Sequence, residues 1–145
     1  MSRLRVIQWT TGKVGKMALR GIFNDPRLEL VGVYAHSADK AGLDAGAICG
    51  RANCGVLATN AVKELLALKA DSVVYKPYKA DLSHLVRLLE SGADVFSTSL
   101  LNDIGGVGGE TGRALAAACL PRAPAGRWQR AKLLFPGLGL SAKKG

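Results

Sequence analysis

Residues 10–16 read Thr-Thr-Gly-Lys-Val-Gly-Lys and have the residue types and spacing that hold a nucleotide phosphate. Gly12 and Gly15 allow the backbone to approach a pyrophosphate closely. The amide end of a following helix attracts anions, and Lys13 or Lys16 adds positive charge. We therefore predict a site for the pyrophosphate of a dinucleotide, made of Thr10, Thr11, Gly12, Lys13, Val14, Gly15 and Lys16.

This segment departs from the usual G-x-G-x-x-G fingerprint at its first position, where Thr10 stands in place of glycine. A structural role stays open for both remaining glycines. Gly12 could serve a tight turn alone, and Gly15 could serve close packing of a helix on a strand. The choice between phosphate binding and a structural role depends on whether the turn lies between a strand and a helix.

Helical and strand patterns alternate from residue 3 to about residue 99 and place the turn between a strand and a helix. Strands separated by helical patterns predict right-handed βαβ units. The predicted class is α/β, a Rossmann-like parallel sheet with helices on both faces. The expected strands are residues 4–9, 28–35, 55–59, 71–75 and 94–99. The expected helices are residues 14–24, 61–69 and 81–91, with Asn60 as the cap of the second and Gly92 ending the third. Residues 39–50 are expected to form a loose helical turn.

The residues after the second predicted strand concern the choice of cofactor. About twenty residues past the glycines, NAD-binding domains carry an acid that accepts the ribose 2′-hydroxyl. His36, Ser37 and Lys40 stand there instead, and they suit the 2′-phosphate of NADP. We predict NADP(H) in preference to NAD(H). Asp39 keeps NAD as the alternative, because a strand end shifted by two residues would bring its carboxylate to the ribose.

Two further strand ends would border the nicotinamide half of the cofactor. One carries Tyr75, and the other carries Thr98 and Ser99. Their hydroxyls could equally serve only to finish the strand ends. His84 lies in a helical pattern, where we interpret it as a surface or helix-face residue, and no catalytic residue is assigned.

The net charge of +9 is concentrated toward the end of the chain. All 11 acidic residues precede residue 111, whereas residues 111–145 carry seven Lys and Arg. We predict an NAD(P)-binding domain over 1–119 and an irregular basic tail, rich in Pro, Gly and Arg, over 120–145. Nucleic-acid binding through this tail is the least favoured function, because Trp128 and Phe135 are its sole aromatic residues.

The three cysteines have no metal-binding or redox spacing, so we expect reduced thiols and no metal. No apolar run reaches the roughly 20 residues that span a bilayer, and the start lacks a secretory signal. The expected location is cytoplasmic, without a membrane partner.

Three segments resemble a known family: Val-Ile-Gln-Trp-Thr-Thr-Gly-Lys-Val-Gly-Lys-Met from residue 6, Tyr-Ala-His-Ser from residue 34 and Val-Leu-Ala-Thr-Asn from residue 56. They resemble the amino-terminal domain of dihydrodipicolinate-reductase-like oxidoreductases, above all actinobacterial ones, and also 2,4-diaminopentanoate dehydrogenase. The likeness covers about residues 3–119. It implies an NAD(P)H-binding domain followed, in full-length members, by a mixed α/β domain that binds substrate and supports a homo-oligomer. It also implies that residues 11–16 contact phosphates, His36 and Ser37 the ribose, and Thr98 and Ser99 the nicotinamide.

The resemblance fades after Cys119, and the histidine- and lysine-containing motif of the family's second domain has no match. We expect a truncated or out-of-frame product, with a locally divergent segment as the alternative. The predicted function is an NAD(P)H-dependent oxidoreductase that transfers a hydride to C=N or C=O, here mainly its cofactor-binding half. A dinucleotide-binding module without turnover is the alternative, and the substrate stays open.

Overall fold

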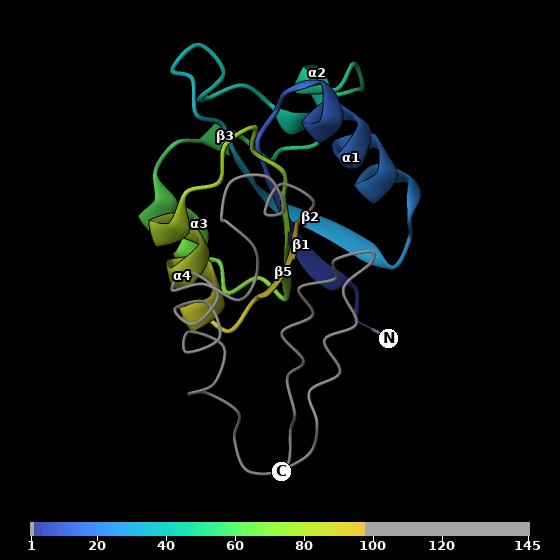
Figure 1. The fold of residues 1–145 in the computed structure, drawn as a ribbon. Helices are drawn as coiled ribbons and strands as arrows, with labels where there is room; N and C mark the ends of the chain where they lie inside the picture. The colour runs from blue at the N-terminus through green and yellow to red at the C-terminus, as the bar shows by residue number, and fades with distance from the viewer. Residues whose placement is uncertain (1, 98–145) are drawn as a thin grey trace.

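The computed structural model describes residues 2–97, which form a parallel sheet with helices on both faces (Figure 1). The strands are parallel, as predicted, and their order, β3-β2-β1-β4-β5, is that of a Rossmann-like sheet. The elements, in chain order, are β1 (Leu4–Trp9), α1 (Lys13–Asn24), β2 (Leu28–Tyr34), α2 (Ala45–Ile48), β3 (Ala58–Thr59), α3 (Val62–Ala67), β4 (Ser72–Tyr75), α4 (Leu82–Glu90) and β5 (Asp94–Ser97).

Each face of the sheet has its own hydrophobic core, because successive side chains of a strand point to opposite faces. In β1, Val6 packs with Leu19 and Ile22 of α1. Ile7, one residue on, packs with Leu65 of α3 and other residues of the opposite core. Figure 1 shows α1 and α2 on one side of the sheet and α3 and α4 on the other.

The path of the chain places the turn between β1 and α1 at the point where the strand order reverses. From β1 the chain passes through α1 to β2 and β3 on one side, and α3 then carries it back to β4 on the other side of β1. In open α/β sheets, ligands bind beyond the carboxyl ends of the strands at such a switch point.

The short edge strand differs from its prediction. β3 is two residues long, whereas 55–59 was expected, because Gly55 has a φ of +88° and belongs to a turn. The Asp44 carboxylate holds this turn through the backbone N–H groups of Cys54 and Gly55, at 2.9 and 2.8 Å. These hydrogen bonds, that of Cys54 above all, lower the pKa of Asp44. Asp44 also caps α2 through the N–H of Gly46, so α2 is the ordered part of the loose turn predicted over 39–50.

The prediction that Asn60 caps α3 is wrong. The N-cap residue is Ala61, and Thr59 takes over the capping role from one residue further back. Its hydroxyl accepts the N–H of Ala61 at 3.0 Å and donates to the Glu64 carboxylate at 3.1 Å. α3 also ends two residues before the predicted boundary at Lys69, which has a φ of +51°.

The predictions for residues 98–145 lie outside the described part of the chain: the last residues of the fifth strand, the domain boundary at 119 and the basic tail. Within residues 2–97, the helices are all too short or too polar to cross a membrane.

Candidate functional site

Gly15 has a structural role in the turn. A Cβ atom at this position would lie 2.3 Å from the carbonyl oxygen and 2.8 Å from the carbonyl carbon of Thr10. Glycine therefore lets α1 approach the end of β1 closely, which buries Leu19 and Ile22 behind it. The packing interpretation is thus supported for this glycine.

Gly12 has a different environment. Its φ of −71° and ψ of −170° are extended values that any residue adopts. Among the described residues outside its own stretch of chain, no heavy atom would lie within 4 Å of a Cβ placed there. Gly12 is also the N-cap residue of α1, whose first turn has no acidic residue. The backbone amides at this helix end are therefore open to an anion.

Thr10, which replaces the first glycine of the fingerprint, adopts a backbone conformation that favours glycine. Its φ is +87°, which is uncommon for a β-branched residue. Three hydrogen bonds hold it. Its N–H donates to Tyr34 O at 3.0 Å, its hydroxyl donates to Lys76 O at 2.9 Å, and its carbonyl oxygen accepts from Gln8 Nε2 at 3.1 Å. Thr10 thus connects the carboxyl ends of β1, β2 and β4.

Gln8 is a site residue that we did not predict. It is fully buried below the turn, and its side-chain N–H group supports Thr10. Its Oε1 atom has no hydrogen-bond partner within the described residues. The signal in the sequence was a polar residue inside the apolar strand Val-Ile-Gln-Trp.

Lys40 lies at the turn, although it is 29 residues from it in sequence. Its Nζ atom donates to Thr11 O at 3.4 Å. A tight turn after β2 brings it there, with Lys40 N–H donating to Ser37 O at 3.1 Å. His36, just before this turn, is exposed, and Ser37 is half-buried. The structure therefore brings the predicted second edge next to the predicted phosphate turn.

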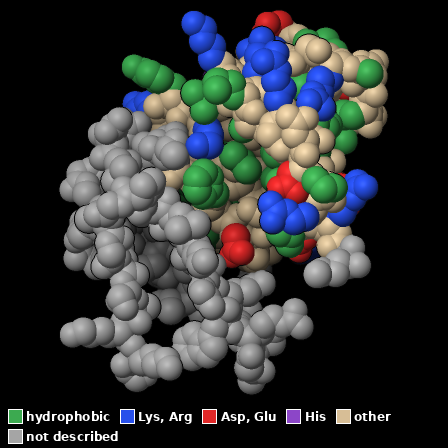
Figure 2. All heavy atoms as spheres, turned by 90° about the vertical axis from the view of Figure 1, so that its right-hand side faces the viewer, with side chains coloured by type: hydrophobic (Ala, Val, Ile, Leu, Met, Phe, Trp, Pro, Cys, Tyr) green, Lys and Arg blue, Asp and Glu red, His purple; other side chains and the backbone are tan. Residues whose placement is uncertain are grey.

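The turn and the helix behind it carry several exposed cations. Lys13, Lys16 and Arg20 are exposed, as is Val14. Figure 2 shows Lys and Arg side chains gathered on the upper part of the face that carries α1. This charge favours an anionic ligand at the turn.

Tyr75 is fully buried, in an aromatic layer at the carboxyl ends of three strands. Trp9 stacks on Tyr34 with 4.2 Å between ring centroids and lies 5.9 Å from Tyr75. The Tyr75 hydroxyl accepts the N–H of Asp81 at 2.8 Å, and burial raises its pKa to about 12. This favours the interpretation that Tyr75 finishes its strand end. Thr98 and Ser99 lie outside the described residues.

His84 belongs to the same aromatic layer. Its ring contacts Trp9 and Tyr34 edge-on, at centroid distances of 5.5 and 5.7 Å. Its Nδ1 atom is 4.0 Å from the Asp81 carboxylate. His84 is therefore a helix-face residue that packs against the end of the sheet.

The Tyr34 hydroxyl has a raised pKa. Burial is the larger cause, and the negative charge of Asp81 is the smaller one.

No protein-family model matches this chain. A curated protein from Streptomyces virginiae named amine dehydrogenase is 35% identical over 105 residues, which cover 67% of this chain and 29% of that protein. The solved amine dehydrogenase from Mycobacterium smegmatis is 24% identical with a TM-score of 0.60, covering 68% of this chain and 30% of that one. GenD2 from gentamicin A biosynthesis, solved in complex with NAD, is 23% identical with a TM-score of 0.61, covering 82% and 32%.

The fold is Rossmann-like. The chain spans less than a third of each of these three proteins. None of the three is named a dihydrodipicolinate reductase, so the resemblance to that family stays a prediction.

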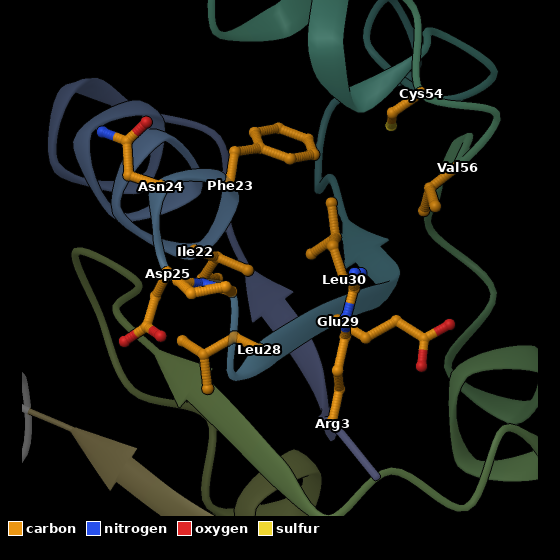
Figure 3. A pocket seen from close by; sticks show the side chains of 11 residues that line it. Arg3, Ile22, Phe23, Asn24, Asp25, Leu28, Glu29, Leu30, Cys54 and Val56 are labelled. Atoms are coloured by element: carbon orange, nitrogen blue, oxygen red, sulfur yellow. The ribbon is translucent and has the colours of Figure 1, made fainter. Parts of the chain in front are cut away.

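A cavity of about 550 Å³ lies away from the turn, at the amino end of β2 (Figure 3). Figure 3 shows side chains from the last turn of α1, from β2 and from the segment with Cys54 and Val56 around it. Arg3 and Leu28 mark its position near the amino ends of β1 and β2. In this fold the ligand edge is the opposite one, so the cavity is not the dinucleotide site.

Two of the three cysteines lie in the part of the chain that the structure describes. Cys49 is buried, Cys54 is exposed, and both are free thiols. No group of three or more His, Cys, Asp and Glu side chains in residues 2–97 is placed to hold a metal ion. Cys119 lies outside this part of the chain.

The strained backbone at Thr10 leads to a prediction with an unusual sign. Inside helices and strands, alanine usually gives a more stable protein than glycine. At a positive φ, however, an alanine is strained by about 1–2 kcal/mol and a glycine is not. Thr10→Ala and Thr10→Gly both lose the hydroxyl bond to Lys76 O. We expect the glycine variant to be the more stable of the two by about 1 kcal/mol in urea denaturation. An alanine variant that is equally or more stable would show that the site carries no strain.

Proposed function

We propose that this chain binds a nicotinamide dinucleotide, with the pyrophosphate on the turn formed by residues 10–16, as the cofactor domain of an oxidoreductase. The observation that carries the proposal is the open backbone at Gly12, where α1 begins without a side-chain cap. An anion there would be met by free amide groups and by the end of the helix dipole. The position at the switch point of the sheet supports the same ligand.

The relatives support the class of reaction. One is named for the dehydrogenation of an amine, and one was solved with NAD. We propose hydride transfer between the nicotinamide and the carbon of a C=N or C=O bond, of which the C=N form fits the amine dehydrogenase name. The cofactor would supply the hydride. This chain would hold the phosphates and orient the nicotinamide, and membership of the dihydrodipicolinate-reductase type is the finer form of the proposal.

We further propose a preference for NADP(H). Lys40 brings an ammonium group from the end of β2 to the turn, within 3.4 Å of Thr11 O. His36 and Ser37 precede it at the strand end, where the adenosine ribose would lie. A 2′-phosphate at this point gains a charge-assisted hydrogen bond, whereas NADH offers a neutral hydroxyl.

The test is a calorimetric titration of the chain with NADPH and with NADH. We expect tighter binding of NADPH, and a loss of about tenfold or more for NADPH in Lys40→Ala, because a hydrogen bond to a charged group contributes about 1.5–3 kcal/mol. The NADH affinity of the same variant should change much less.

Lys63→Ala is the matched control, since Lys63 is an exposed lysine of α3 on the opposite face. Equal losses for both nucleotides in Lys40→Ala would assign Lys40 to the shared phosphates, and tighter binding of NADH by the wild type would contradict the NADP(H) preference. No saturable binding of either nucleotide by a folded sample would overturn the proposed function.

A further inference from the structure

The loop that follows β4 carries an aromatic ring in full contact with water. Tyr78 has a relative exposure of 105%, the highest among the large hydrophobic residues of the described chain. β4 is a direct neighbour of β1, and Trp9 pairs with Tyr75 at the ends of the two strands. The loop therefore starts level with Thr10, at the carboxyl edge where the turn lies.

Both ends of this loop are fastened. At its start, the N–H of Lys76 donates to Trp9 O at 3.3 Å, and Lys76 O accepts the Thr10 hydroxyl at 2.9 Å. At its end, the N–H of Asp81 donates to the buried Tyr75 hydroxyl at 2.8 Å. Pro77 fixes one further backbone angle between these points. The tyrosine ring is thus exposed on a backbone that is tied to the phosphate turn itself.

Lysines stand close to Tyr78 in the chain and on the turn to which its loop is tied, and they suit a ligand that joins a planar ring to phosphates. Lys76 Nζ lies over the Phe96 ring, 4.9 Å from its centroid, and Lys79 is exposed beside Tyr78. Lys13 and Lys16 are exposed on the turn to which the loop is tied. An exposed aromatic ring near cations is the arrangement on which nucleic-acid bases stack.

We propose that Tyr78 stacks on a base of the dinucleotide whose pyrophosphate lies on the turn. The inference rests on the proposed function and adds a recognition residue to it. A tyrosine held on an anchored loop loses little conformational freedom when it binds, so that most of the stacking energy is retained.

The experiment compares Tyr78→Ala and Tyr78→Phe with the wild type in calorimetric titrations with NADPH, ADP-ribose and inorganic pyrophosphate. We expect Tyr78→Ala to weaken NADPH binding by roughly tenfold, within the range that loss of one stacked aromatic ring gives. Tyr78→Phe keeps the ring and should bind like the wild type. Pyrophosphate has no base, so its affinity should not change.

ADP-ribose identifies the base. A similar loss for ADP-ribose and NADPH supports stacking on adenine, and a loss confined to NADPH supports stacking on nicotinamide. Leu4→Ala is the matched control, because Leu4 is an exposed hydrophobic residue at the opposite end of β1.

Two results would overturn the inference while leaving the proposed function in place. One is unchanged NADPH affinity in Tyr78→Ala when the wild type binds. The other is an equal loss for pyrophosphate, which would show that the loop only shapes the phosphate turn. A wild type that binds neither NADPH nor NADH would instead overturn the proposed function and this inference together.

Discussion

Gly12→Asp is expected to abolish dinucleotide binding while leaving the fold intact. The new carboxylate would lie at the open N-cap position of α1, where the pyrophosphate is proposed to bind. Like charges held together at a binding site cost several kcal/mol, so we expect the Kd for NADPH to rise by about 100-fold or more. Asp is a better N-cap residue than Gly, so the free energy of unfolding should stay equal or rise slightly.

Calorimetric titration and thermal unfolding of the same samples separate these two effects. Gly21→Asp is the control, since it makes the same substitution later in α1, at a position with no described heavy atom within 4 Å of its Cβ. It should bind NADPH like the wild type. Wild-type affinity in a folded Gly12→Asp variant would contradict the proposed site.

Gly15→Ala is expected to cause the largest loss of stability. Its Cβ would lie 2.3 Å from the carbonyl oxygen of Thr10, which is a backbone atom and cannot rotate away. The end of β1 and the start of α1 must then separate. Such overpacking costs typically 1–3 kcal/mol, which lowers the melting temperature of a domain of this size by roughly 5–20 °C.

The measurement is thermal unfolding followed by circular dichroism, with Gly21→Ala as control. The control removes a glycine from the same helix without a contact and should be more stable than the wild type by about 0.5–1 kcal/mol. Opposite signs for two identical substitutions in one helix would establish the close approach at Gly15. A Gly15→Ala variant that melts with the wild type would rule it out.

The order of strands and helices could be predicted from the sequence because it depends on local patterns. Between Leu82 and Leu89, apolar residues recur at helical spacing, which predicts α4. Gly92, with a φ of +91°, follows the end of that helix. The roles of Gly12 and Gly15 could not be separated in this way. Their difference depends on the position of Thr10 O, which is known only when the strand and the helix are packed.

Other features depend on contacts between distant segments. The distance of Lys40 from the glycines predicts that it lies near the adenosine ribose of a bound cofactor, but its hydrogen bond to Thr11 O follows from the turn after β2. Tyr75 and His84 could not be assigned to the aromatic layer, since that requires the register of three strands and the position of α4. Thr59 caps α3 instead of Asn60, because its hydroxyl, at the end of β3, reaches both the N–H of Ala61 and the Glu64 carboxylate.

The aromatic layer also gives the molecule an optical signal at the turn. The Trp9 indole contacts the rings of both Tyr34 and His84, and Trp9 directly precedes Thr10 in the chain. The sequence contains one other tryptophan, Trp128, so Trp128→Phe leaves Trp9 as the single tryptophan, which can be excited apart from the tyrosines. A ligand that seats on the turn and moves the Thr10 backbone would change the wavelength or the lifetime of Trp9 emission. Occupancy of the turn could then be followed in real time, without a label and without turnover.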